Sequence, residues 1–131
     1  MCSSDLLDYM KELAAADPGD AGHQRGLAIT YLAIADLLTG LGRNAMALPE
    51  YRRAIAISQA LSASDPRKGE TRIDLAHMYS HYGRTLQAMG RPTAAAAFEK
   101  AGFLFSEAAK LDPANANIAK GQAELTGEMR H

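Results

Sequence analysis

His77 and His81 are the two side chains of this sequence whose type and spacing could support chemistry. Four residues apart, they would lie one above the other on a helix, and imidazoles at this spacing can bind a metal ion such as zinc. The metalloprotease pattern places a glutamate directly after the first histidine, whereas this chain has Met78, and His23 is far upstream. We therefore expect no metal and no cofactor, and we interpret the pair as exposed histidines beside Arg84. A metal-binding or enzymatic site at His77 and His81 is the least favoured alternative.

Motifs for nucleophilic catalysis and phosphate binding are missing from the sequence. The single cysteine, Cys2, stands at the chain terminus, where a thiol has no fixed surroundings. Gly19, Gly22 and Gly26 precede an expected helix but follow no expected strand, so they do not form a dinucleotide-binding fingerprint. We expect a protein that is not an enzyme.

The composition favours helices and excludes several classes of partner. Valine, which favours strands, does not occur, and alanine, the best helix former, is the commonest residue. The net charge is −1, with 14 basic and 15 acidic residues, so we expect no binding of nucleic acid or of membrane surfaces. No apolar run reaches the length of a membrane span, and the first residues do not resemble a signal peptide. These features, with the lone cysteine, predict an all-α protein in the cytoplasm.

Asp-Pro pairs divide the chain at a nearly constant interval. They stand at residues 17–18, 65–66 and 112–113, which gives steps of 48 and 47 residues. A fixed period of roughly 20–50 residues is the sequence signature of a repeat architecture. We expect each pair to close one helix and open the next, because aspartate can cap a helix and proline presets a turn.

Each repeat has the pattern of two helices joined by a glycine-containing turn. The first helix carries an apolar stripe at helical spacing. This stripe comprises Leu27, Tyr31, Ile34, Ala35 and Leu38 in the first unit, and Leu75, Tyr79, Tyr82, Gly83 and Leu86 in the second. Gly42 and Gly90 follow these helices in the manner of C-terminal glycines. In the second helix of the first unit, Asn44 is the expected N-cap, and Pro49 predicts a late start or a bend.

These residues resemble the tetratricopeptide repeat, whose pattern is aromatic-x2-Leu-Gly-x2-Tyr, then Ala-x3-Phe, then Pro. The first unit has Tyr31-x2-Ile34-Ala35-x2-Leu38, Ala47-x3-Tyr51 and Pro66, and the second has Tyr79-x2-Tyr82-Gly83-x2-Leu86, Ala94-x3-Phe98 and Pro113. The resemblance covers residues 4–129 and implies a right-handed superhelix of helical hairpins that binds proteins. The standard repeat is about 34 residues long, so we infer that each helix here has gained about two turns at its Asp-Pro end. Long repeats of this kind are similar to those in bacterial proteins, including arrays that follow serine/threonine kinase domains.

The resulting prediction is one all-α domain, an antiparallel helical-hairpin solenoid of about five helices. We expect a partial repeat at residues 4–16, complete repeats at 18–64 and 66–111, and a capping helix at 113–129. In the last helix, Gln122 and Thr126 take the positions of two apolar residues of the preceding repeat. Such polar substitutions suit a terminal helix that covers the open end of a solenoid.

The resemblance implies that the first helix of each hairpin lines a concave face. The candidate partner-binding residues, found by stepping around the helix from the apolar stripe, are Ile29, Leu32, Asp36 and Thr39 in the first unit and His77, Ser80, His81, Arg84 and Gln87 in the second. The first set is mostly apolar, and the second is polar and partly cationic. We expect a protein or peptide partner that carries an apolar part beside an acidic or polar part. The alternative is an ordinary solvated helix face.

An apolar stripe also marks the helix that begins the chain. It comprises Leu6, Leu7, Met10 and Leu13. An exposed apolar stripe tends to find a partner, so we expect a homodimer through this helix. The alternative is that the stripe packs entirely on Leu27, Tyr31 and their neighbours. The predicted function is a non-catalytic protein–protein interaction module within a larger regulatory or signalling protein. A structural spacer or self-association segment is the alternative.

Overall fold

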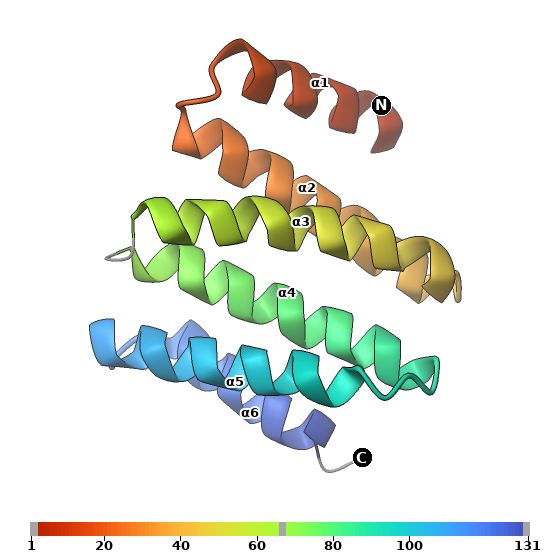
Figure 1. The fold of residues 1–131 in the computed structure, drawn as a ribbon, viewed down its shortest axis with the longest axis vertical. Helices are drawn as coiled ribbons and strands as arrows, with labels where there is room; N and C mark the ends of the chain where they lie inside the picture. The colour runs from red at the N-terminus through yellow and green to blue at the C-terminus, as the bar shows by residue number, and fades with distance from the viewer. Residues whose placement is uncertain (1–2, 66–67, 130–131) are drawn as a thin grey trace.

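The structure is a computed structural model that describes residues 3–65 and 68–129, and it is a stack of antiparallel helices (Figure 1). The described residues contain no strand and form six helices: α1 (Ser3–Ala16), α2 (Ala21–Gly40), α3 (Asn44–Ser64), α4 (Gly69–Ala88), α5 (Ala94–Leu111) and α6 (Ala116–Met129). The predicted all-α antiparallel solenoid is confirmed, with six helices where about five were expected. The two ends of the chain lie at opposite ends of the stack.

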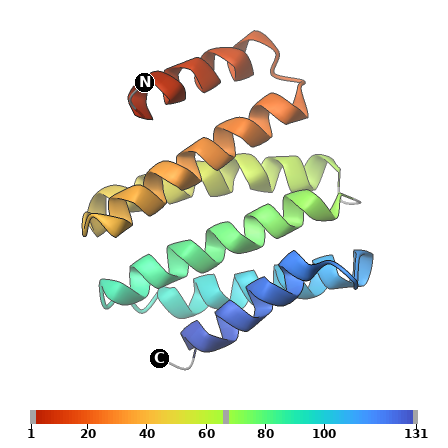
Figure 2. The same cartoon turned by 180° about the vertical axis from the view of Figure 1, so that it is seen from behind.

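The helices alternate between two layers. α2, α4 and α6 form the face nearer the viewer in Figure 2, which we call the first-helix face, and α3 and α5 lie behind them. α4 packs against all four helices around it, namely α2, α3, α5 and α6. The first-helix face is therefore continuous from α2 to α6, and side chains from three helices can meet on it.

The turns inside the two complete hairpins have the same structure. Gly42 (φ 78°) and Gly90 (φ 69°) adopt the left-handed conformation that favours glycine. The next N–H donates back to the end of the helix, from Arg43 N to Leu38 O at 2.8 Å and from Arg91 N to Leu86 O at 2.9 Å. This is the helix-ending motif expected of a C-terminal glycine. The predicted glycine ends are confirmed at both turns.

The start of α3 differs from the prediction. The helix begins at Asn44 and continues through Pro49, so a late start at the proline is wrong. Arg43, not Asn44, occupies the N-cap position, and its side chain makes no capping hydrogen bond. Proline is tolerated because the carbonyl that loses its helical N–H partner belongs to Ala45, an exposed residue of the first turn.

The core is built from aromatic rings set against glycine and alanine. Tyr51 and Phe105 are the largest fully buried side chains among the described residues. A Cβ atom added at Gly83 would lie 2.8 Å from a ring carbon of Phe98, and one added at Gly121 would collide with the ring of Phe105. The missing side chains at these two glycines therefore let α4 and α6 approach the aromatic residues of α5 closely.

Candidate functional site

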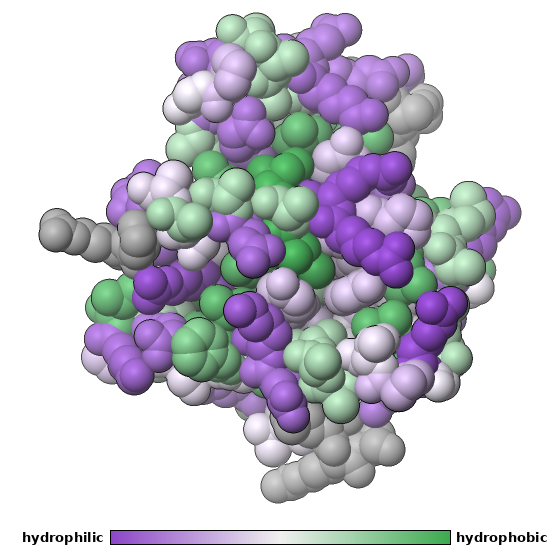
Figure 3. Space-filling model, viewed as in Figure 1, coloured by the Kyte–Doolittle hydropathy of each residue, from purple (hydrophilic) through white to green (hydrophobic). Residues whose placement is uncertain are grey.

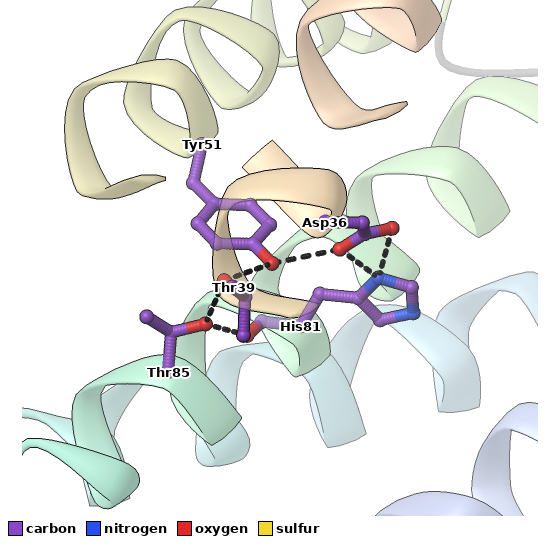
Figure 4. Close-up of polar contacts among 5 residues, drawn as sticks. All are labelled: Asp36, Thr39, Tyr51, His81 and Thr85. Carbon is purple, nitrogen blue, oxygen red and sulfur yellow. Dashed lines mark hydrogen bonds and ion pairs between the residues drawn. The ribbon is translucent and has the colours of Figure 1, made fainter. Parts of the chain in front are cut away.

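A polar network joins α2, α3 and α4 at one end of the first-helix face (Figure 4). The Tyr51 hydroxyl donates to Asp36 Oδ1 at 2.7 Å, and His81 Nδ1 lies 3.0 Å from both carboxylate oxygens of Asp36. Because a carboxylate only accepts hydrogen bonds, the proton of this pair is placed on His81 Nδ1. The Thr39 hydroxyl lies 3.3 Å from Tyr51 Oη and 3.2 Å from Thr85 Oγ1. One carboxylate therefore connects three consecutive helices.

The network keeps Asp36 ionised. Burial acts to raise the pKa of this carboxyl, but the hydrogen bonds from His81 and Tyr51, together with the nearby charge of Arg84, outweigh burial and lower the pKa below 3.8. The same burial raises the pKa of the Tyr51 phenol above 10.0. At neutral pH the centre of the network is thus a carboxylate that accepts from a neutral phenol and from His81 Nδ1.

His77 lies one helical turn before His81 and faces a different set of neighbours. Its ring stands edge-on to Phe105, with 5.1 Å between ring centroids, and 6.4 Å from the ring of His81. Burial, followed by the charge of His81, lowers the pKa of His77 below 6.5. Within the described part of the chain, no three His, Cys, Asp or Glu side chains are grouped so that they could hold a metal. His77 is therefore suited to hydrogen bonding as a neutral imidazole.

The depressed pKa of His77 predicts that acid weakens the fold. The unfolded chain takes up a proton at this position near pH 6.5, whereas the folded chain does so only at lower pH, so stability falls as the pH drops through this window, by up to about 1.4 kcal/mol per pH unit for one group. Urea unfolding at pH about 7.5 and about 5.5 measures this loss. His77→Phe should reduce it. An unchanged loss in His77→Phe would contradict the prediction.

A groove on the first-helix face runs beside this network and has a volume of ≈ 490 Å³. Three helices line it, with Ile29 and Leu32 from α2, Ile73, Asp74, His77, Met78 and His81 from α4, and Asn117, Lys120 and Glu124 from α6. The α2 wall is apolar, and the α6 wall carries both signs of charge. The structure thus brings four of the predicted residues, Ile29, Leu32, His77 and His81, into one groove.

The other predicted partner-binding residues have different surroundings. Asp36 and Thr39 are partly exposed, but both are engaged in the network described above. Arg84 is exposed and Gln87 partly exposed. Ser80 is buried, with 6% of its surface exposed, so its assignment to the binding face is corrected. The reason is helical phase, because Ser80 follows the fully buried Ala76 by four residues and shares its face.

The polar residues of α6 were missed, although the repeat register contained a signal for them. With the 47-residue step, Glu124 falls on His77, a predicted binding-face position, and Lys120 falls on Ile73, which lies one turn earlier on the same side of the helix. The prediction also missed a second group of residues, which joins α2 to α4 at the other end of the groove. There Arg25 Nε donates to Asp74 Oδ2 at 2.7 Å, and Arg25 Nη1 lies 2.6 Å from Glu70 Oε1. Charged side chains therefore link α2 to α4 at both ends of the groove.

The predicted self-association stripe of α1 is divided by the fold. Leu7 and Met10 pack against the hydrophobic core, and Met10 lies over Gly26 of α2. Leu13 is partly buried, whereas Leu6 remains 43% exposed. The neighbouring Tyr9 is 54% exposed. The apolar surface of α1 that is open to a partner is therefore centred on Leu6 and Tyr9.

No helix in the described residues is both long enough and apolar enough to cross a membrane.

Comparisons with other sequences bear on the α2–α3 hairpin. None of the curated proteins matches the chain. A family model does match it, from within α2 to within α3, over a span with the roughly 34-residue length of one standard repeat. The hairpin of α2 and α3 thus carries, at residues 28–61, a match to the Tetratricopeptide repeat family, whose members are protein-interaction modules.

Proposed function

We propose that this chain is a non-catalytic interaction module that docks a segment of a protein partner in the groove of the first-helix face. The observation that carries the proposal is the groove itself, which three successive helices line and which has a volume of ≈ 490 Å³. A peptide-sized hollow lined by side chains from several rigid helices is the form that peptide recognition takes in helical scaffolds. The tetratricopeptide match at residues 28–61 supports the same class of function.

The walls of the groove indicate the chemistry of the partner segment. Ile29 on the α2 side is 40% exposed and offers an apolar contact. On the other side, His77 offers a neutral imidazole, and Lys120 and Glu124 offer one charge of each sign. A segment with an apolar side chain followed by polar or charged groups would satisfy both walls. Exposed Arg84, whose charge also acts on Asp36, adds positive charge beside the network and favours an acidic group on the partner.

The wider setting is part of the proposal. We infer a cytoplasmic regulatory or signalling protein in which this chain forms a single repeat domain. The division into a partial repeat, two complete repeats and a capping helix stays a prediction, as does the relation to bacterial arrays that follow kinase domains. The helix boundaries and the repeated glycine turns support the division.

The proposal predicts that Arg84→Glu weakens partner binding by about tenfold, equivalent to about 1.4 kcal/mol, because the variant repels an acidic group near the network. Peptides selected from a displayed random library against the full chain supply the ligand, and calorimetry measures their affinity. Arg91→Glu, an exposed arginine in the α4–α5 turn, is the matched control. Circular dichroism must show unchanged helix in both variants. Selected peptides that perturb no groove residue in NMR spectra would reject the groove as the site, and equal affinities for the two variants would reject a contact between Arg84 and the partner.

Self-association is the second candidate function, and a specific observation favours it. Leu6 and Tyr9 leave an apolar surface on α1 that no described part of the chain covers. Exposed apolar surface of this kind often marks an interface with another chain. In this role the chain acts as a structural spacer or an assembly segment, with or without a ligand in the groove.

A further inference from the structure

α1 presents two parallel stripes of different chemistry to its surroundings. Leu6, Tyr9 and Leu13 share one face of the helix, since they are spaced by three and four residues. Asp5, Asp8 and Glu12, all exposed, have the same spacing one residue earlier and lie directly beside that face. α1 therefore combines an apolar strip, exposed at Leu6 and Tyr9, with an acidic strip along the same side.

A second groove lies on the opposite side of the molecule from the first-helix face, between α3 and α5. Its residues are Gln59, Ser62 and Ala63 of α3, Arg72 and Leu75 of α4, and Lys100, Phe103, Leu104 and Glu107 of α5. Phe103 is 58% exposed, which is unusual for a phenylalanine, and Lys100 Nζ lies 5.9 Å from its ring centroid. Figure 3 shows hydrophobic side chains exposed among polar ones on this side of the molecule.

Among the described residues of the α3–α5 groove, the acidic side chain has an ion-pair partner, whereas the two basic side chains have none. Glu107 is paired with Lys110 at 2.9 Å, outside the groove lining. Among the described residues, neither Arg72 nor Lys100 has an ion-pair partner within 4.0 Å. The groove therefore offers an apolar floor, an exposed aromatic ring and two available cations.

We propose that α1 of one copy of this chain docks in the α3–α5 groove of a second copy. Leu6 and Tyr9 would cover Phe103 and the apolar floor, while Asp8 and Glu12 would approach Lys100 and Arg72. An amphipathic helix in a groove between two helices is a recurrent mode of recognition, and the complementary charges fix its orientation. Each copy has one α1 and one groove, so two copies can satisfy each other in a closed two-fold dimer.

This inference rests on the second candidate function, self-association through α1, and names the surface that receives the helix. A single helix of 14 residues buries little area compared with obligate dimers. The expected complex is therefore weak, and salt weakens it further, because its charges lie at the surface. Measurements consequently need the full chain at low ionic strength and at concentrations up to the near-millimolar range.

Charge reversal on the two surfaces tests the proposal by sedimentation equilibrium. We expect the chain to dimerise, and we expect both Asp8→Lys/Glu12→Lys and Arg72→Glu/Lys100→Glu to raise the dimer dissociation constant at least tenfold. Mixing the two variants should restore the dimer, because the basic helix of the first then meets the acidic groove of the second, and the acidic helix of the second meets the basic groove of the first. Phe103→Ala, which changes no charge, should also weaken the dimer. Circular dichroism checks that each variant is folded.

The outcomes separate the two proposals. A chain that stays monomeric at every concentration overturns both self-association and the docking surface. A dimer that survives both charge reversals overturns the α3–α5 groove alone, as does a mixture of the two variants that remains monomeric. Restored association in the mixture, with neither variant dimeric by itself, supports the docking of α1 in the groove.

Discussion

Replacing Phe105 with alanine should lower the free energy of unfolding by about 3–5 kcal/mol, the loss expected when a large aromatic side chain is removed from a packed core. The ring is fully buried, stands edge-on to His77 and fills the space that Gly121 leaves open. Its removal would therefore open a cavity between α4, α5 and α6. Because a domain of this size has a total stability of only about 5–15 kcal/mol, a large part of it depends on this one ring.

The same helix supplies the matched control. Phe103 is two residues away, has the same side chain and is 58% exposed, so Phe103→Ala should change stability by less than about 0.5 kcal/mol. Urea unfolding followed by circular dichroism at neutral pH gives both free energies. A loss in Phe105→Ala as small as the one expected for Phe103→Ala would show that the packing of α6 on α5 does not depend on Phe105. The two variants also separate two roles of α5, since Phe103→Ala is expected to weaken association and Phe105→Ala is expected to destabilise the fold.

The fold could be predicted from local signals that repeat along the chain. The apolar stripe of each first helix and the glycine after it depend on residues within one or two turns, so they can be read without knowing the tertiary structure. The family match leaves out residues 21–27 of α2 and 62–64 of α3. These are the Asp-Pro ends of the helices, where the sequence predicts the added turns. The late start expected from Pro49 is wrong because the local cost of the proline is small where the residue that loses its helical partner, Ala45, is exposed.

The binding face could be predicted only in part. Helical phase tells on which side of its helix a residue lies, but not which residues of other helices it contacts. Phase places Ile29, His77 and His81 on one surface, and they line one groove. It does not reveal that Asp36 meets Tyr51 and His81, which are 15 and 45 residues away in sequence. Those contacts depend on where three helices converge. Arg25 and Asp74, 49 residues apart, form their ion pair for the same reason.

Replacing Asp36 with alanine should lower the free energy of unfolding by about 1–3 kcal/mol, because the Tyr51 hydroxyl, in a side chain only 1% exposed, loses its acceptor, and His81 loses its partner. The loss should lie in the lower part of this range, since the Asp36 side chain is 40% exposed and water can replace some of the lost contacts. Glu99→Ala, an exposed acid in α5, should change stability by less than about 0.5 kcal/mol.

A double-mutant cycle with Tyr51→Phe tests whether the network acts as one unit. If the hydrogen bond from Tyr51 to Asp36 contributes to the fold, the combined loss falls short of the sum of the single losses by at least about 0.5 kcal/mol, whereas independent sites would add. Tyr51 is buried and cannot touch a ligand in the groove, but Asp36 and His81 link it to the groove wall. A lower peptide affinity in Tyr51→Phe would therefore mean that the network positions the wall. Unchanged affinity together with additive losses of stability would show that the network neither positions the groove wall nor acts as one unit in the fold.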